Sequence, residues 1–363
     1  MPLATRIRAL ITKIRDFSTG APPGTLFVPS DPSRARFAAR LNSFRVRERE
    51  YWPGLNGKAT TLDLIARAAK VGRLNCVDLN YPDHLATYDE RELIARMQDK
   101  GVSLNGYAMR YYGDEALRIG AFTNPDPKIR RAAIDLTKRG LDSLASVGGK
   151  LMTLWMGQDG FDYSFQADYG QLWDHTIAAI REVADHNREI DVSIEYKPNE
   201  PRSFSLMPNA ATSLLAIREI DRTNLGVTLD FAHVLFADEM PAFAAALVAR
   251  HSRLLGVHLN DGYGKRDDGL MVGAVHPVQT AELLFVLDRI GYDGAIYFDT
   301  FPDTTGLDPI GECEANIAVV VALRKAVDAL RANDELAAAI AQQDAVRSQR
   351  IVQAALYGAK PSG

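Results

Sequence analysis

The sequence predicts an α/β fold, a (β/α)8 TIM barrel with an N-terminal arm and a C-terminal helical extension. From residue 36 onward, eight short apolar runs alternate with segments whose apolar residues recur three and four positions apart. This is the pattern of strands alternating with amphipathic helices. The 363 residues, 47% of them hydrophobic, suit one barrel with an extension. We assign residues 1–35 to the arm, 36–332 to the barrel and 333–363 to the extension.

The N-terminal arm carries Arg and Lys every few residues and ends in the Pro/Gly-rich stretch GAPPG. It therefore lacks the unbroken apolar segment of a secretory signal. No later stretch approaches the roughly 18 to 20 apolar residues that cross a membrane. We expect a cytoplasmic protein without a membrane partner.

The elements of the barrel follow one another with short connections. The candidate strands are 36–44, 75–81, 102–109, 150–157, 192–198, 225–236, 254–261 and 294–301, and the candidate helices between them are 60–70, 89–100, 129–146, 172–186, 209–220, 240–251 and 278–290. A strand, a helix and a second strand joined in this way pair in parallel. Eight such units suit a closed barrel.

An open doubly wound sheet is the structural alternative, and a phosphate-binding loop would favour it. The glycines of DGYGKRDDG, residues 261–269, follow a candidate strand, but no helix begins there. The aspartates of this loop would also repel a pyrophosphate. A nucleotide site is therefore not expected.

The C-terminal part of the chain is helical in pattern. Residues 311–334 supply a helix that closes the barrel, and residues 334–360 continue as a further helical stretch. An appended helix of this kind packs on its own barrel or on a neighbouring subunit. We expect a homo-oligomer, either a tetramer or a dimer.

The overall charge excludes some partners. A net charge of -4 and a pI near 6.0 give no general attraction to phosphate backbones, so nucleic acid is not expected as a partner. Cys76 and Cys313 lie far apart in the sequence, which argues against a disulfide framework or a thiolate metal site. A small ligand fits this composition better.

Ionisable residues stand at the ends of the last four candidate strands. These are Glu195 with Lys197, Asp230 with His233, His258 with Asp261 beside the polar Asn260, and Asp299. In such barrels the reactive groups lie at the C-terminal ends of the strands. Carboxylates packed together repel unless a cation lies among them. Three carboxylates and one imidazole predict a divalent ion, with Mn²⁺, Mg²⁺ or Co²⁺ ahead of Zn²⁺.

Several motifs resemble the xylose isomerase family. IEYKPNEPR (194–202) resembles its EPKPNEPR signature, and LDFAH, FDTFP, IGAFTNPDPKIRRAAI and ALRANDELAAAI are similar to further segments of that family. The His of VHLND and the following loop with LMVG resemble the bacterial L-rhamnose isomerase branch. The resemblance covers roughly residues 36 to 345. It implies a normally tetrameric barrel that converts aldoses to ketoses at a two-metal site, which is an intramolecular oxidoreductase reaction on a small carbohydrate.

The resemblance also implies roles for single residues. The first metal would be held by Glu195, Asp230, His258 and Asp299, and a second would share Asp230 and add His233 and one or both of Asp267 and Asp268. Lys197 would polarise the sugar carbonyl. Trp155 would form a wall of the sugar pocket.

Two positions depart from the family pattern. Asn80 stands where xylose isomerase has a ring-opening His, although Asp83 matches the acid that orients it, and Gly269 aligns with an expected second-site acid. We therefore expect one or two metal ions per subunit. Further substrate contacts are predicted for Asn80, Asn260, Gln158 and Asp159, the last two in a polar loop after the fourth strand.

The number of metal ions decides between two enzyme classes. Two ions suit a hydride shift between adjacent carbons, whereas one ion suits removal of a carbon-bound proton by a carboxylate. The second scheme is that of ketose 3-epimerases and of the barrel subunits that cleave 3-keto C-glycosides, for which a second kind of subunit is expected. A sugar-binding barrel without enzymatic activity is a third class, but it has no reason to keep Lys197 beside the carboxylates.

Overall fold

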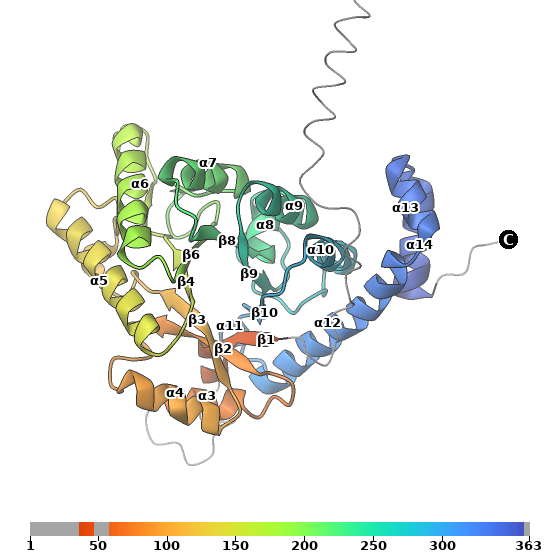
Figure 1. Ribbon diagram of the computed structural model, residues 1–363, viewed down its shortest axis with the longest axis horizontal. Helices are drawn as coiled ribbons and strands as arrows, with labels where there is room; N and C mark the ends of the chain where they lie inside the picture. Colours follow the sequence, from red (N-terminus) through yellow and green to blue (C-terminus); the bar gives the residue numbers. More distant parts are fainter. Residues whose placement is uncertain (1–35, 47–57, 359–363) are drawn as a thin grey trace, which may run out of the picture. The chain divides into compact units, whose positions relative to one another are not determined.

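The structure is a computed structural model that describes residues 36–46 and 58–358. Eight parallel strands close into a barrel in the order β1-β10-β9-β8-β6-β4-β3-β2 (Figure 1). They are β1 Phe37–Arg40, β2 Cys76–Tyr81, β3 Ser103–Met109, β4 Leu151–Trp155, β6 Asp191–Glu195, β8 Leu225–Asp230, β9 Leu254–Leu259 and β10 Ile296–Phe298. The predicted barrel is confirmed, and each candidate strand run overlaps one of these strands. The predicted arm, residues 1–35, lies outside the described residues.

Helices follow the strands and lie around the outside of the barrel (Figure 1). They are α3 Thr61–Ala68, α4 Glu90–Asp99, α5 Pro127–Ser146, α6 Tyr169–His186, α7 Ala210–Ile220, α8 Phe231–Phe236, α9 Pro241–His251, α10 Pro277–Ile290, α11 Pro302–Thr305, α12 Pro309–Arg331, α13 Asp334–Ala341 and α14 Ala345–Tyr357, with 3-10 turns η2 Leu41–Arg45 and η3 Glu115–Leu117. Several begin at a capping side chain, as at Asp126 and Asp168, which accept hydrogen bonds from backbone N–H groups of the first turn. In the described part of the chain, no helix combines the length and apolar character needed to cross a membrane.

One predicted strand is shorter than its apolar run. The run 225–236 contains strand β8 only as far as Asp230, and helix α8 begins at the next residue. The Asp230 side chain accepts a hydrogen bond from the backbone N–H of His233 at 3.0 Å, so the carboxylate that ends the strand also caps the helix. This turn places Asp230 and His233 at the same end of the barrel.

A small antiparallel pair of strands, not expected from the sequence, joins the segments that follow β4 and β6. It consists of β5 Gly160–Phe161 and β7 Phe204–Ser205, and the rings of Phe161 and Phe204 stack with centroids 5.2 Å apart. Arg202 reinforces this pair through an ion pair from its Nε to Asp162 Oδ2 at 2.8 Å. Strands of two residues carry no periodic pattern, which is why the sequence did not indicate them.

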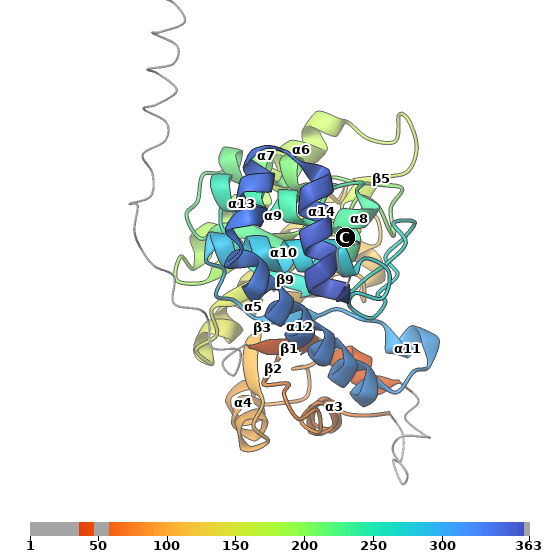
Figure 2. The same ribbon diagram turned by 90° about the vertical axis from the view of Figure 1, so that its right-hand side faces the viewer.

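The C-terminal extension consists of two helices where one continuous stretch was predicted. Asn333 caps α13 and Asp344 caps α14, and between them Gln343 adopts a left-handed conformation with φ +55°. Leu336 and Ala339 of α13 are buried, while α12 leads from the barrel into this helix pair (Figure 2). The predicted oligomer and the predicted domain boundaries stay predictions.

We predict that Gly106 is required for the close approach of β3 and β4. A Cβ at this position would lie 2.6 Å from the backbone oxygen of Leu151. Gly106→Ala should therefore lower the free energy of unfolding by about 1 to 3 kcal/mol, the usual cost of overpacking. Gly72→Ala is the control, because no atom lies within 4 Å of its built Cβ. Equal denaturation midpoints for the two variants would contradict this account of the strand contact.

Candidate metal centre

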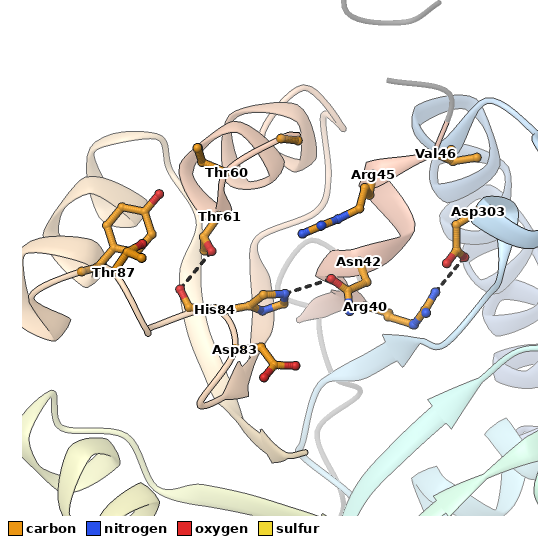
Figure 3. Close-up of a pocket in the computed structure, with 12 residues that line it drawn as sticks. Arg40, Asn42, Arg45, Val46, Thr60, Thr61, Asp83, His84, Thr87 and Asp303 are labelled. Atoms are coloured by element: carbon orange, nitrogen blue, oxygen red, sulfur yellow. Dashed lines mark hydrogen bonds and ion pairs between the residues drawn. The ribbon is translucent and has the colours of Figure 1, made fainter. Parts of the chain in front are cut away.

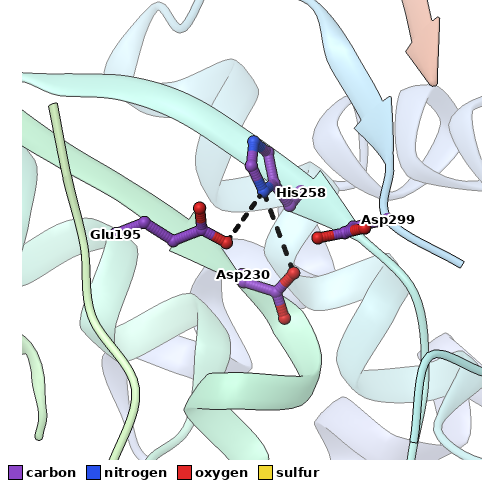
Figure 4. A group of neighbouring side chains, drawn as sticks. All are labelled: Glu195, Asp230, His258 and Asp299. Carbon is purple, nitrogen blue, oxygen red and sulfur yellow. Dashed lines mark hydrogen bonds and ion pairs between the residues drawn. The ribbon is translucent and has the colours of Figure 1, made fainter. Parts of the chain in front are cut away.

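Four neighbouring strands bring one potential ligand each to the mouth of the barrel. Glu195 ends β6, Asp230 ends β8, His258 lies in β9 and Asp299 directly follows β10. One ligand atom from each of these residues lies within 4.8 Å of the others (Figure 4). The register contributes directly, because Asp230 and His258 are paired positions of adjacent parallel strands. The structure thus brings together the four residues predicted as the first metal site.

Glu195 and His258 form a close pair within the cluster, and each shifts the pKa of the other. The Nδ1 atom of His258 lies 3.2 Å from Glu195 Oε1, and both side chains are buried. Burial would raise the pKa of Glu195, but His258 outweighs this and holds the pKa at about 2. Burial would likewise lower the pKa of His258, whereas Glu195 raises it to about 9. Without an ion, this pair therefore stabilises a proton on the imidazole.

Asp230 is held in place by Asn260, and its surroundings destabilise the negative charge of its carboxylate. The Asn260 side-chain amide donates to both carboxylate oxygens of Asp230 at 3.1 Å, and its carbonyl oxygen accepts from the Ala232 N–H at 2.8 Å. Burial, together with the nearby acids, raises the pKa of Asp230 to about 7 against the opposing charge of His233. Burial also raises the pKa of Asp299. Two carboxylates of the cluster are thus unfavourable as anions in the absence of a cation.

The donor set fits a hard or borderline divalent ion. It offers three carboxylates and one imidazole, which are ligands that Mg²⁺, Mn²⁺ and related ions accept. Asp299 Oδ1 is buried and has no hydrogen-bond partner, and the nearest basic atom, Arg40 Nε, is 3.8 Å away. Two oxygens on opposite sides of a bound ion lie about 4.2 Å apart or slightly more, which is close to the span of this cluster.

The residues predicted for a second metal are held by one another instead. Asp267 Oδ2 accepts from Lys197 Nζ and from His233 Nε2, both at 3.1 Å. The other ring nitrogen of His233 lies 3.0 Å from the backbone oxygen of Tyr196. Among the described residues, the four-residue cluster is the only group of three or more suitable side chains. A second ion bound to Asp267 would therefore have to compete with the Lys197 ammonium for this carboxylate.

The loop after β9 explains why the ligand set predicted for a second metal is incomplete. Gly269 has φ +56°, and a Cβ there would lie 2.3 Å from the ring of Phe301, so an acid cannot occupy this position without moving the ring. Asp268 points elsewhere, since its carboxylate accepts from the backbone N–H of Tyr263 and from Arg266 Nε, both at 2.8 Å. Of the two aspartates predicted for the second metal, only Asp267 lines the cavity that also contains Lys197.

A cavity of about 380 Å³ is lined by three of the four ligands, Glu195, His258 and Asp299. Its wall includes the predicted residues Trp155, Gln158, Lys197, His233 and Asp267. It also includes Arg40, Asp78, Arg110, Tyr112 and Tyr297, which the sequence analysis did not single out. Arg40 ends β1 and Arg110 directly follows β3, so the rule used for the late strands would have identified both if applied to the early ones.

Several predicted contacts lie elsewhere. Asp159 Oδ1 accepts from the Thr123 hydroxyl at 2.6 Å and from the N–H groups of Ala121 and Thr123, so it holds the loop before α5. Asp159 and Asn260 are buried and do not line the cavity. Both contribute to the support of the cavity wall.

Asp83 lines a different cavity, of about 670 Å³, next to His84 (Figure 3). His84 Nδ1 accepts from the backbone N–H of Asn80 at 3.0 Å, and its Nε2 lies 2.9 Å from Asn42 Oδ1. Burial lowers the pKa of His84 to about 3, which keeps the ring neutral. The structure therefore separates Asp83 from the four-ligand cluster, and Asn80 does not line the cluster's cavity.

The cavity wall contains buried polar atoms without protein partners. Among the described residues, these include Arg110 Nε, Trp155 Nε1, Gln158 Oε1, Asp267 Oδ1 and Asp299 Oδ1. A buried donor or acceptor left unpaired costs about 1 to 3 kcal/mol. Donors and acceptors gathered in one cavity are complementary to a ligand with several hydroxyl groups.

Comparison with known proteins agrees with the resemblance inferred from the motifs. A family model described as xylose isomerase-like TIM barrel matches residues 65–325. The xylose isomerase of Thermus thermophilus is 27% identical over 221 residues, which cover 58% of this chain and 57% of that protein. The match thus spans a little over half of the relative's own length.

Solved structures of similar fold include two sugar epimerases. An L-ribulose 3-epimerase superposes with a TM-score of 0.63 at 16% identity and covers 81% of this chain and 96% of its own. D-psicose 3-epimerase from Clostridium cellulolyticum H10 gives 0.59 at 17% identity, covering 80% and 98%. At such identities the similarity establishes the barrel fold alone.

We predict that Asp230 and Asp267 differ in their effect on metal binding. Asp230→Asn should weaken Mn²⁺ affinity by about 100-fold or more, because even outer contacts of a metal site are worth about 10- to 100-fold. Asp267→Asn should leave the affinity within about threefold, since Asp267 already bonds to Lys197 and His233. Calorimetric titration of metal-free protein measures both. Equal losses would contradict the assignment of a single four-ligand site.

Proposed function

This chain belongs to the xylose isomerase-like TIM barrel family, and we propose that it is a divalent-metal-dependent sugar isomerase that interconverts an aldose and a ketose by proton transfer. The observation that carries this proposal is that Lys197 lines the same small cavity as three of the four candidate ligands, Glu195, His258 and Asp299. A sugar carbonyl held there would meet a cation on one side and an ammonium group on the other. A protein that only binds a sugar would need neither the cation nor the ammonium group beside the carbonyl.

The ion would be held by Glu195, Asp230, His258 and Asp299. A bound divalent cation supplies Lewis-acid polarisation of the sugar carbonyl, which makes the hydrogen on the adjacent carbon more acidic. The raised pKa values of Asp230 and His258 belong to the metal-free protein, and their protons would leave when the ion binds.

Lys197 is positioned to stabilise negative charge on the carbonyl oxygen. Its Nζ donates to Asp267 at 3.1 Å and to Glu200 at 3.0 Å, and it lies 5.5 Å from the centre of the Trp155 ring. Burial would lower the pKa of Lys197, but these two acids outweigh burial and raise it. The side chain is therefore an ammonium donor at neutral pH, and its preorganised charge favours the enediolate over the neutral sugar.

Asp78 is the carboxylate best suited to accept the carbon-bound proton. It lines the cavity, and its Oδ1 is anchored by the Asn105 side-chain amide at 2.7 Å. Burial raises the pKa of Asp78 to about 6, close to the value at which a general base works best near neutral pH. The Trp155 ring would pack against the C–H face of the sugar.

The geometry favours proton transfer over a hydride shift. A hydride shift with two ions would need a second ligand set, and the positions predicted for it hold Gly269 and the Lys197–Asp267 pair. Epimerisation at the carbon next to a ketose carbonyl is the second candidate function. The solved 3-epimerases share this barrel fold, and epimerisation would use the same proton removal followed by return to the opposite face.

A panel of pentoses and hexoses in deuterated water tests the proposed function. With Mn²⁺-loaded protein we expect aldose and ketose to interconvert and the product to carry solvent deuterium on the former carbonyl carbon, because the proton removed from the adjacent carbon is replaced there. Conversion of a ketose into its 3-epimer with deuterium at C3 would replace isomerisation by the second candidate. Full retention of the substrate hydrogen would contradict proton transfer.

We predict that Lys197→Met lowers kcat by about 100-fold or more, the usual loss when a preorganised oxyanion donor is removed. Its effect on KM should be smaller, because the charge that Lys197 meets develops during the reaction. Lys265→Met is the control, since Lys265 is exposed and does not line the cavity. Steady-state kinetics measure both variants. Unchanged turnover in Lys197→Met would remove this residue from the mechanism.

A further inference from the structure

The cationic side chains of the cavity wall differ in their pairing. Arg40 donates to Asp303 at 2.8 Å, and Lys197 pairs with Asp267 and Glu200. Arg110 is the exception among the described residues that line the cavity, because no carboxylate lies within ion-pair distance of it. Its Nε is buried and lacks an acceptor.

Arg110 rests on an aromatic surface that leads toward Lys197. Its guanidinium carbon lies 5.6 Å from the centre of the Tyr112 ring, and Tyr112 meets Trp155 edge to face with centroids 5.6 Å apart. Lys197 lies over Trp155, the other ring of this aromatic pair. A sugar packed along these rings would therefore reach from Lys197 at one end to Arg110 at the other.

The strand order places Arg110 across the mouth from one metal ligand, His258. Arg110 follows β3, and in the closed order β1-β10-β9-β8-β6-β4-β3-β2 strand β3 stands four positions from β9, which carries His258. The ligands come from β6, β8, β9 and β10. A group on the substrate that reaches Arg110 would therefore lie on the side of the mouth away from His258.

A role in balancing the acidic cluster does not account for this arrangement. The charge of Arg110 does favour ionised Glu195, but it is a lesser influence than His258. A divalent ion among the ligands would supply that compensation itself. A planar guanidinium without a carboxylate partner, with its central carbon 5.6 Å from the centre of the Tyr112 ring, is suited instead to two parallel hydrogen bonds with a carboxylate or a phosphate.

We propose that Arg110 binds an anionic group, a carboxylate or a phosphate ester, at the end of the sugar remote from the metal centre, so that the substrate is an acidic sugar. This inference rests on the proposed sugar-binding function of the cavity. With a volume of about 380 Å³, the cavity is of a size for one monosaccharide carrying a small anion.

Binding of unreactive analogues tests the proposal without relying on turnover. Glucitol, gluconate and glucitol 6-phosphate are titrated calorimetrically into Mn²⁺-loaded protein. We expect at least one of the two anions to bind about tenfold or more tightly than glucitol, as charge-assisted hydrogen bonds allow. Whichever anion has the larger advantage identifies the group as a carboxylate or a phosphate.

Neutral variants of Arg110 show whether that advantage comes from the guanidinium. Arg110→Met and Arg110→Gln should abolish it while glucitol affinity and manganese content stay unchanged, and two variants ensure that a folded one is available. Arg118→Met is the control, because Arg118 is largely exposed, pairs with Glu115 and does not line the cavity. Equal or undetectable binding of all three compounds to the unmodified protein overturns the proposal. So does an anion advantage that survives in the neutral variants, since the metal would then hold the anion. Anion binding without any sugar turnover would refute the proposed isomerase function alone.

Discussion

The repulsion among three carboxylates gathered at neighbouring strand ends is the constraint on which the rest of the site depends. Glu195, Asp230 and Asp299 are brought together by the closure of the barrel, with ligand atoms within 4.8 Å of one another and of His258. Side chains placed by a rigid parallel sheet cannot move apart to relieve this repulsion. They must bind protons or a cation, and the donor set matches a divalent ion.

The same electrostatic requirement organises the remainder of the cavity. Asp267 is neutralised by Lys197 and His233, which leaves the lysine fixed as a donor facing the substrate. Gly269, packed against Phe301, leaves the neighbouring position without the acid that a second ion would need. In the proposed function, one ion, the Lys197 ammonium and the Arg110 guanidinium would divide the cavity into a reacting end and a recognition end.

Much of this could be predicted from the sequence because strand ends in a closed barrel converge. The period of the apolar residues located all eight strands, and the acids at the last four ends indicated the cluster. The orientation of loop residues could not be predicted in this way. Asp268 turns from the cavity because it bonds to the Tyr263 backbone and Arg266, and Asp159 holds a neighbouring loop. Such choices depend on turn geometry, which has no periodic signal.

The most direct measurement of the central claim is anomalous X-ray diffraction from crystals of the protein soaked in Mn²⁺. One anomalous peak is expected per chain, within bonding distance of Glu195, Asp230, His258 and Asp299, and none beside His233 and Asp267. A second peak of similar height beside Asp267 would contradict the single-ion account. The absence of any peak among the four ligands would contradict the metal centre itself.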